Sequence, residues 1–323
     1  MTITNDESNP AMSLAARFAG PLSQTYEDLS RLSRLHPEFV KECLTAIDVS
    51  RARLRRPSTG EIFPHLVAQS LTLDDKDRRA LMAAWLALLG YICIVDHELD
   101  QKGYITGQKS IAASALLGWG VATLGRYTTG TPFASVFLDS INRAFAGQYE
   151  DIQLRSSTDA DRQRSDKDKN RACLAAVAGF CAAAREPDDH MVRSAEALLG
   201  PFQILDDLED LEEDEGQENI TIFVRIAREY ISTVKSPSRM EMYRAIIGDA
   251  RTVSALRRAA AGFEKALLLL DSRRDLALIE YIGEMRIRTI DLVSVLDDYQ
   301  RDRSPIKEPE IMRRIEQVAS GCT

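Results

Sequence analysis

The chain has 323 residues, of which 45% are hydrophobic and 28% are charged. This composition excludes a wholly disordered or collagen-like chain and provides enough apolar side chains for a sizeable core. The formal net charge of −8 excludes a broad basic surface for nucleic acid or anionic lipid. We therefore expect anionic ligands to bind only through local cations or a metal ion.

The cysteines and histidines indicate neither a disulfide framework nor a zinc site. The five cysteines form no Cys-x-x-Cys pair, and no His-Glu-x-x-His sequence is present. The first nine residues lack the apolar core of a secretion signal, and the longest apolar run, Ala80–Val95, is too short to span a membrane. We expect a cytoplasmic protein with reduced thiols and no stable membrane insertion.

The chain predicts helices almost throughout, between a flexible tail at residues 1–12 and a polar tail at residues 301–323. A charged link at 155–168 and an acidic, solvated loop at 212–218 interrupt the pattern. The predicted helices cover residues 22–34, 37–56, 76–99, 111–127, 132–152, 169–184 and 188–213, followed by two or three more up to about residue 299. This pattern predicts one all-α domain over residues 13–300 with ten to twelve helices. The alternative is two helical bundles joined by the charged link.

Two carboxylates end the long apolar helix predicted at residues 76–99. Asp96 and Asp100 are four residues apart, which places both on one helix face. Charges that follow an apolar run directly need solvent, a paired cation or a metal ion. The spacing alone is also typical of a solvated helix end.

A denser acidic run lies about 110 residues further along the chain. Asp206 and Asp210 share one face of the predicted helix, Gln203 precedes them by one turn, and Asp207 is adjacent. Like charges this close repel each other unless a counter-charge is present, and Mg²⁺ prefers carboxylate oxygens together with substrate phosphates. The two acidic runs together predict a magnesium site that binds a diphosphate. A ferritin-like di-iron site would instead require Glu-x-x-His pairs, which are absent.

These segments resemble the motifs of the isoprenoid synthase superfamily, which contains the trans-prenyl diphosphate synthases and the class I terpene synthases. Phe202–Asp210 resembles the second aspartate-rich motif of that superfamily, and Asp96–Asp100 resembles the first. Gly147–Asp151 is similar to a Gly-Gln-x-x-Asp landmark between the two motifs. Lys169 stands where the superfamily has a diphosphate-contacting Lys-Thr, with Asn170 in place of the Thr. The resemblance extends over residues 58–225.

The departures from the pattern concern cations. Chain-elongating members carry a Gly-Gly-Lys-Arg-x-Arg-Pro segment that binds isopentenyl diphosphate, whereas Gly60–Pro64 stands in the corresponding place without its cations. Gln101–Gly103 replaces an Arg-Arg-Gly, and Gln217 replaces the Lys that often follows the second motif. A second diphosphate needs fixed cations. A displaced set would be Arg53, Arg55 and Arg56, which are also typical of a solvated basic helix end.

The resemblance implies a single large helical bundle of the isoprenoid synthase type, three Mg²⁺ ions per active site, a prenyl diphosphate substrate and a homodimer. It also implies roles for individual residues. The implied catalytic and metal-binding carboxylates are Asp96, Asp100, Asp206 and Asp210, with Asp207 among the catalytic groups. The implied diphosphate-binding residues are Lys169, Gln203 and Lys102. The expected substrate pocket comprises Phe63, Tyr91, Gln148, Tyr149, Phe180 and Phe202.

Three functions are consistent with these features. The first is a terpene synthase, which ionises one allylic diphosphate and then cyclises or quenches the carbocation. The second is a trans-prenyltransferase that joins a prenyl diphosphate to isopentenyl diphosphate or to another acceptor. The third is a non-catalytic subunit of a prenyl synthase. We favour the terpene synthase, because most cations for a second diphosphate are missing. His97 is either a metal ligand or general base, or, as we prefer, a residue pointing away from the Asp96 face.

Overall fold

We describe a computed structural model of the chain. It describes residues 14–54, 58–102, 104–153, 168, 170–185, 188–216, 221–231, 238–270, 276–302 and 308–319. Within these ranges all regular structure is helical, in fourteen helices. This agrees with the predicted all-α class, with more helices than expected.

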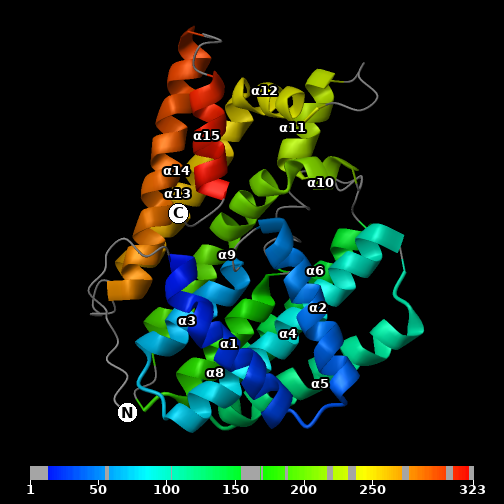
Figure 1. Cartoon of the computed structure of the whole chain (residues 1–323). Coiled ribbons are helices and arrows are strands. Elements are labelled where there is room, and N and C mark those ends of the chain that lie inside the picture. Colours follow the sequence, from blue (N-terminus) through cyan, green and yellow to red (C-terminus); the bar gives the residue numbers. More distant parts are fainter. Residues whose placement is uncertain are drawn as a thin grey trace.

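The helices form two groups that are joined by α9 (Figure 1). The first group consists of α1 (Leu14–Leu32), α2 (Pro37–Leu54), α3 (Thr59–Ser70), α4 (Asp75–Lys102), α5 (Gly107–Thr128), α6 (Ala134–Gln153) and α8 (Arg171–Ala183). The connecting helix α9 spans Asp189–Glu209. The second group consists of α10 (Leu211–Gly216), α11 (Ile222–Ile231), α12 (Arg239–Ile247), α13 (Ala250–Leu270), α14 (Leu276–Asp302) and α15 (Glu308–Ala319).

Helix α4 is the central helix of the first group and ends in the first acidic run. Asp75 and Asp77 lie in its first turn, where the positive end of the helix dipole stabilises carboxylates. Residues Asp75–Leu99 are long and apolar enough to cross a membrane, but more than half of this stretch is buried inside the protein. Since α4 packs against α1, α2, α5 and α8, its apolar length is that of a core helix.

Helix α9 carries the second acidic run to the boundary between the two groups. Its N-terminus is capped by Asp188, whose carboxylate accepts a hydrogen bond from the His190 amide. Its middle is pressed against α13, where a Cβ added at Gly262 would lie 2.3 Å from Pro201 Cγ. Only glycine allows this approach. Because both its start and its middle are held, the acidic end of α9 has a fixed direction.

Three segments differ from the sequence expectation. The start of α3 at Thr59 follows a capping box formed by Ser58 and Glu61, in a stretch expected only to interrupt the helices. The predicted acidic loop contains the short helix α10, in which Asp214 is buried. The predicted polar tail contains α15, because four of its apolar side chains share one face and pack on the core: Ile311, Met312, Ile315 and Val318.

Candidate active site

The larger cavity, of about 160 Å³, lies where the two groups of helices meet. Its wall is formed by α3, α4, α8, α9 and α14, and most of it is apolar. Phe63 and Phe202 pack edge to face at 5.3 Å between ring centroids, and Phe202 also contacts Phe263. The other apolar lining residues are Trp85, Leu89, Ile92, Ala172, Cys173, Leu199, Leu205 and Met285. Such a wall binds an apolar chain and excludes water.

The polar lining of this cavity comes mainly from the last turn of α9 and the start of α8. Asp206 and Glu209 belong to α9, and Asn170 is the N-cap residue of α8. Asp206 is exposed and lies one turn beyond Phe202, so its carboxylate is placed at the boundary between the apolar wall and solvent. The cavity therefore has an apolar interior and an acidic mouth.

The first acidic run approaches the same mouth from α4. Ile92 lines the cavity, and Asp96 follows it by four residues, which places both on one face of α4. The half-buried Asp96 accepts a hydrogen bond of 2.6 Å from Gln148 Nε2 of α6. Burial and, to a smaller extent, the charge of Asp96 raise the pKa of Tyr91. The α4 segment that leads to Asp96 and the last turn of α9 thus border one cavity.

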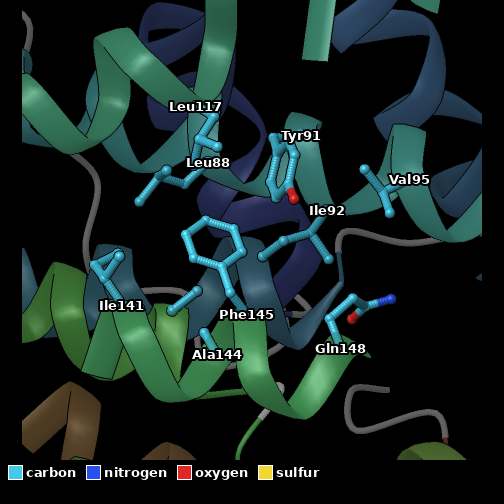
Figure 2. A pocket seen from close by; sticks show the side chains of 10 residues that line it. Leu88, Tyr91, Ile92, Val95, Leu117, Ile141, Ala144, Phe145 and Gln148 are labelled. Atoms are coloured by element: carbon cyan, nitrogen blue, oxygen red, sulfur yellow. The ribbon is translucent and has the colours of Figure 1, made fainter. Parts of the chain in front are cut away.

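A second, much smaller cavity of about 20 Å³ lies between α4, α5, α6 and α8 (Figure 2). Figure 2 shows Tyr91 and Phe145 side by side across it, and their rings are 5.9 Å apart at 77°. Ile92 and Ala172 line both cavities. The two cavities are therefore adjacent, with Ile92 and Ala172 in the wall between them.

Three polar side chains connect the start of α8 to the end of α9. Asn170 Nδ2 donates to Gln203 Oε1 at 2.5 Å, and Gln203 Nε2 donates to Asp207 Oδ1 at 2.6 Å. Gln203 and Asp207 are 7% and 6% exposed. Asp207 therefore faces the protein interior, whereas its neighbour Asp206 faces the cavity. Gln203, expected to bind diphosphate, uses one donor and its acceptor oxygen within the protein.

An ion network holds the start of α8 beside this connection. Arg171 is buried, and it donates to Asp168 and to Glu196 of α9, each at 2.9 Å. Asp168 also accepts from Arg143 of α6 at 2.6 Å. Because a buried guanidinium needs partners for its charge, this network fixes Asn170 relative to both α6 and α9.

A buried ion pair also holds α4 close to Asp96. Glu98 is 2% exposed and forms a salt bridge of 2.7 Å with Lys109 of α5. Asp96 and Glu98 are two residues apart, so they point to different sides of α4. Asp96 lies on the face of α4 that carries Ile92, and Glu98 pairs with α5 on another side of the helix.

The start of α3 has no cation in the segment that corresponds to the isopentenyl diphosphate site. Glu61 is 2% exposed; its carboxylate accepts from the Ser58 amide at 2.9 Å and from the Tyr26 hydroxyl. Gly60 contributes its carbonyl to Trp85 Nε1 at 2.8 Å. These contacts stabilise the helix start and the cavity wall. Residues Gly60–Pro64 contain no basic side chain, and the residue that follows them, His65, is buried.

Several expected site residues lie elsewhere or outside the described part of the chain. Phe180 is fully buried in the core and lines neither cavity, while Tyr149 is 67% exposed, so both expectations are corrected. An aromatic side chain on a buried helix packs against whichever neighbouring element its side of the helix meets. The amino-acid composition does not reveal which element that is. Lys169, Arg55 and Arg56 lie outside the described residues, as do the side chains of Asp100, Lys102 and Arg53. His97 is half-buried.

The sequence analysis missed several lining residues. Counting back from Asp96 along one helix face gives Ile92, Leu89 and Trp85, so helical periodicity would have found them. Met285 comes from α14, almost 200 residues away, and no local pattern predicts its place.

The donor set suits magnesium that is bound together with a phosphate group. Among the described residues no group of three or more His, Cys, Asp or Glu side chains is arranged to hold a metal ion. Mg²⁺ typically takes one or two protein carboxylates, with waters and substrate phosphates as the other ligands. Asp206, which lines the cavity, and Asp96, one turn beyond the lining residue Ile92, fit this pattern without a preformed cluster.

Comparisons with known proteins agree with this arrangement at the level of the fold. No protein-family model matches the chain, and no curated protein sequence matches it. The structure is similar to that of geranylgeranyl pyrophosphate synthetase from the archaeon Geoglobus acetivorans, with a TM-score of 0.61 and 15% identity. The match covers 83% of this chain and 97% of that one. The chain therefore has the isoprenoid synthase fold.

Proposed function

We propose that the protein is a trans-prenyltransferase, which ionises an allylic prenyl diphosphate and transfers the prenyl group to an acceptor. The observation that carries the proposal is the larger cavity, which combines an apolar interior with two carboxylates of α9, Asp206 and Glu209, and whose wall includes Ile92, one turn before Asp96 on α4. The similarity to a geranylgeranyl pyrophosphate synthetase supports a transferase more than the terpene synthase favoured by the sequence analysis.

In this proposal the residues at the mouth bind the metal and the diphosphate, and those of the interior bind the prenyl chain. Asp96 and Asp100 on one wall, and Asp206 and Asp210 on the other, hold magnesium and thereby orient the diphosphate. Bound magnesium supplies positive charge that stabilises the departing diphosphate. Lys169 and Lys102 donate to the phosphate oxygens. The apolar wall around Phe202 receives the prenyl chain and keeps water from the cation.

A terpene synthase is the second candidate, and one observation favours it. At the start of α3, where a chain-elongating enzyme needs cations for its second diphosphate, the side chain in place is the buried Glu61. An acceptor without a diphosphate, such as an indole or a peptide side chain, would reconcile this observation with a transferase.

The test is an incubation of the purified protein with Mg²⁺ and each of geranyl, farnesyl, geranylgeranyl and geranylfarnesyl diphosphate. Each is tested with and without isopentenyl diphosphate, and products are analysed by gas chromatography and mass spectrometry before and after phosphatase treatment. The Asp206→Asn variant is the matched control, because it removes one mouth carboxylate with little change of shape.

The outcomes separate the candidates. A longer diphosphate that forms only with isopentenyl diphosphate supports the transferase. A hydrocarbon or alcohol from one allylic diphosphate alone, lost in Asp206→Asn, supports the terpene synthase and rejects the transferase. No turnover of any diphosphate, with or without candidate acceptors, rejects both and favours a non-catalytic subunit.

A further inference from the structure

The connection from Asn170 through Gln203 to Asp207 has a defined direction. An ionised carboxylate only accepts hydrogen bonds, so Asp207 requires the NH₂ group of Gln203 to point toward it. The Gln203 oxygen then faces Asn170, which must present its own NH₂ group. One buried carboxylate thus determines which way two successive side-chain amides point.

The direction matters because Asn170 lines the larger cavity. With its Nδ2 committed to Gln203, the other branch of the Asn170 amide, Oδ1, accepts no hydrogen bond from the described residues. A carbonyl oxygen at this wall interacts favourably with positive charge on a bound group or accepts a hydrogen bond from it. A flipped amide would present an NH₂ group and have the opposite effect.

We propose that Asp207 is a positioning residue, whose carboxylate orients Gln203 and Asn170 so that the Asn170 oxygen is available to the substrate cavity. The inference rests on the proposed function, since it assigns the Asn170 oxygen a contact with the positive charge that develops on the prenyl group when the diphosphate departs. It separates Asp207 from Asp206, its neighbour in the acidic run. Asp206 is exposed at the mouth, whereas Asp207 is 6% exposed and bound to Gln203.

The proposal predicts a rescue that a metal-binding role of Asp207 does not. Asp207→Asn replaces an acceptor-only carboxylate with an amide that can either accept or donate, so the directions of the Gln203 and Asn170 amides are no longer fixed. Adding Gln203→Glu fixes the direction of the hydrogen bonds again. The new carboxylate at position 203 accepts from the new amide at position 207 and from Asn170 Nδ2. The pair keeps its total charge, and Asn170 again has its oxygen free.

The experiment compares four proteins with the wild type: Asp207→Asn, Gln203→Glu, the double variant and Asp206→Asn. Asp291→Asn, on an exposed position of α14, controls for the loss of one negative charge. Each is measured for kcat and KM with the accepted prenyl diphosphate, for the Mg²⁺ concentration that gives half-maximal rate, and for the midpoint of thermal unfolding.

We expect Asp207→Asn to lower kcat by about tenfold to hundredfold with an unchanged Mg²⁺ requirement, because misplaced groups cost rate of this order. Asp206→Asn should raise the Mg²⁺ requirement. The double variant should recover most of the kcat and most of the unfolding midpoint lost in the single variants. A raised Mg²⁺ requirement in Asp207→Asn, or a double variant no better than the single ones, overturns the proposal. If the wild type turns over no prenyl diphosphate, the proposed function fails, and the unfolding midpoints alone show whether residues 203 and 207 are coupled as the orientation requires.

Discussion

The acidic ends of α4 and α9 contain similar runs of residues but are held in different ways. On α4, Asp96 shares a helix face with the cavity-lining Ile92 and accepts a hydrogen bond from Gln148, while Glu98 forms a salt bridge with Lys109. On α9, Asp206 is exposed at the mouth, while Asp207 is the end of a chain of amides that reaches α8. In each run one carboxylate lies on the cavity side of its helix, and another is buried and bonded within the protein. An acidic motif is therefore not a set of equivalent ligands.

The largest effect is expected at the mouth carboxylates. Asp206→Asn should lower turnover about 10³-fold, because the proposed function requires its charge to hold magnesium beside the diphosphate. Steady-state kinetics at saturating substrate, over a range of Mg²⁺ concentrations, measure this. Unchanged turnover at low Mg²⁺ would show that the α9 end takes no part in metal binding.

Removal of the α4 anchor should change stability more than chemistry. Lys109→Met removes the salt bridge of the buried Glu98 and should lower the free energy of unfolding by about 2 kcal/mol, because a hydrogen bond to a charged group contributes about this much. Urea denaturation measures this change. Lys41→Met is the matched control, since its partner Glu38 is exposed and the pair should contribute little. Equal losses in the two variants would mean that Glu98 is not a buried anchor.

The pH dependence of stability should come partly from His65, away from both acidic runs. Burial and, to a smaller extent, the charge of Arg78 lower the pKa of His65 from 6.5 to about 4. The unfolded chain therefore binds a proton first, and the free energy of unfolding falls as the pH drops below about 6.5. The loss should reach about 2 kcal/mol at pH 5 relative to pH 8.

His65→Gln should remove this loss, whereas the exposed His190→Gln should retain it. Urea denaturation at several pH values measures both. The same variant then separates the pH dependence of the fold from that of the mouth carboxylates. If wild type and His65→Gln lose stability equally on acidification, the assignment to His65 is wrong.

The smallest effect is expected from the glutamines that hydrogen-bond the acidic runs of α4 and α9. Gln148→Leu removes one hydrogen bond to Asp96 and should lower kcat by about tenfold, because a bond to a charged group contributes about 1.5 kcal/mol or more. Gln203→Leu breaks two bonds and should cost more. A larger loss in Gln148→Leu would reverse the comparison between α4 and α9.

The sequence predicts the all-α class and most helices, because 3.6-residue periodicity is local. It places Asp96 and Asp206 at helix ends for the same reason. It separates Asp206 from Asp207 by helix face and assigns the metal to Asp206, but it does not reveal that Asp207 is bonded to Gln203 and, through it, to Asn170 at the start of another helix. The α15 helix was missed because its apolar face is sparse among charged residues. Met285 lines the cavity through tertiary packing alone.

The most direct test asks whether the α4 and α9 ends act as one site. Pyrophosphate is titrated calorimetrically, at a fixed Mg²⁺ concentration, into the wild type, Asp96→Asn, Asp206→Asn and the double variant. We predict that each single variant weakens binding strongly and that the double variant is little worse than either, because both carboxylates hold the same metal-bound diphosphate. Losses that add fully, or a single variant that binds like the wild type, would contradict a shared mouth.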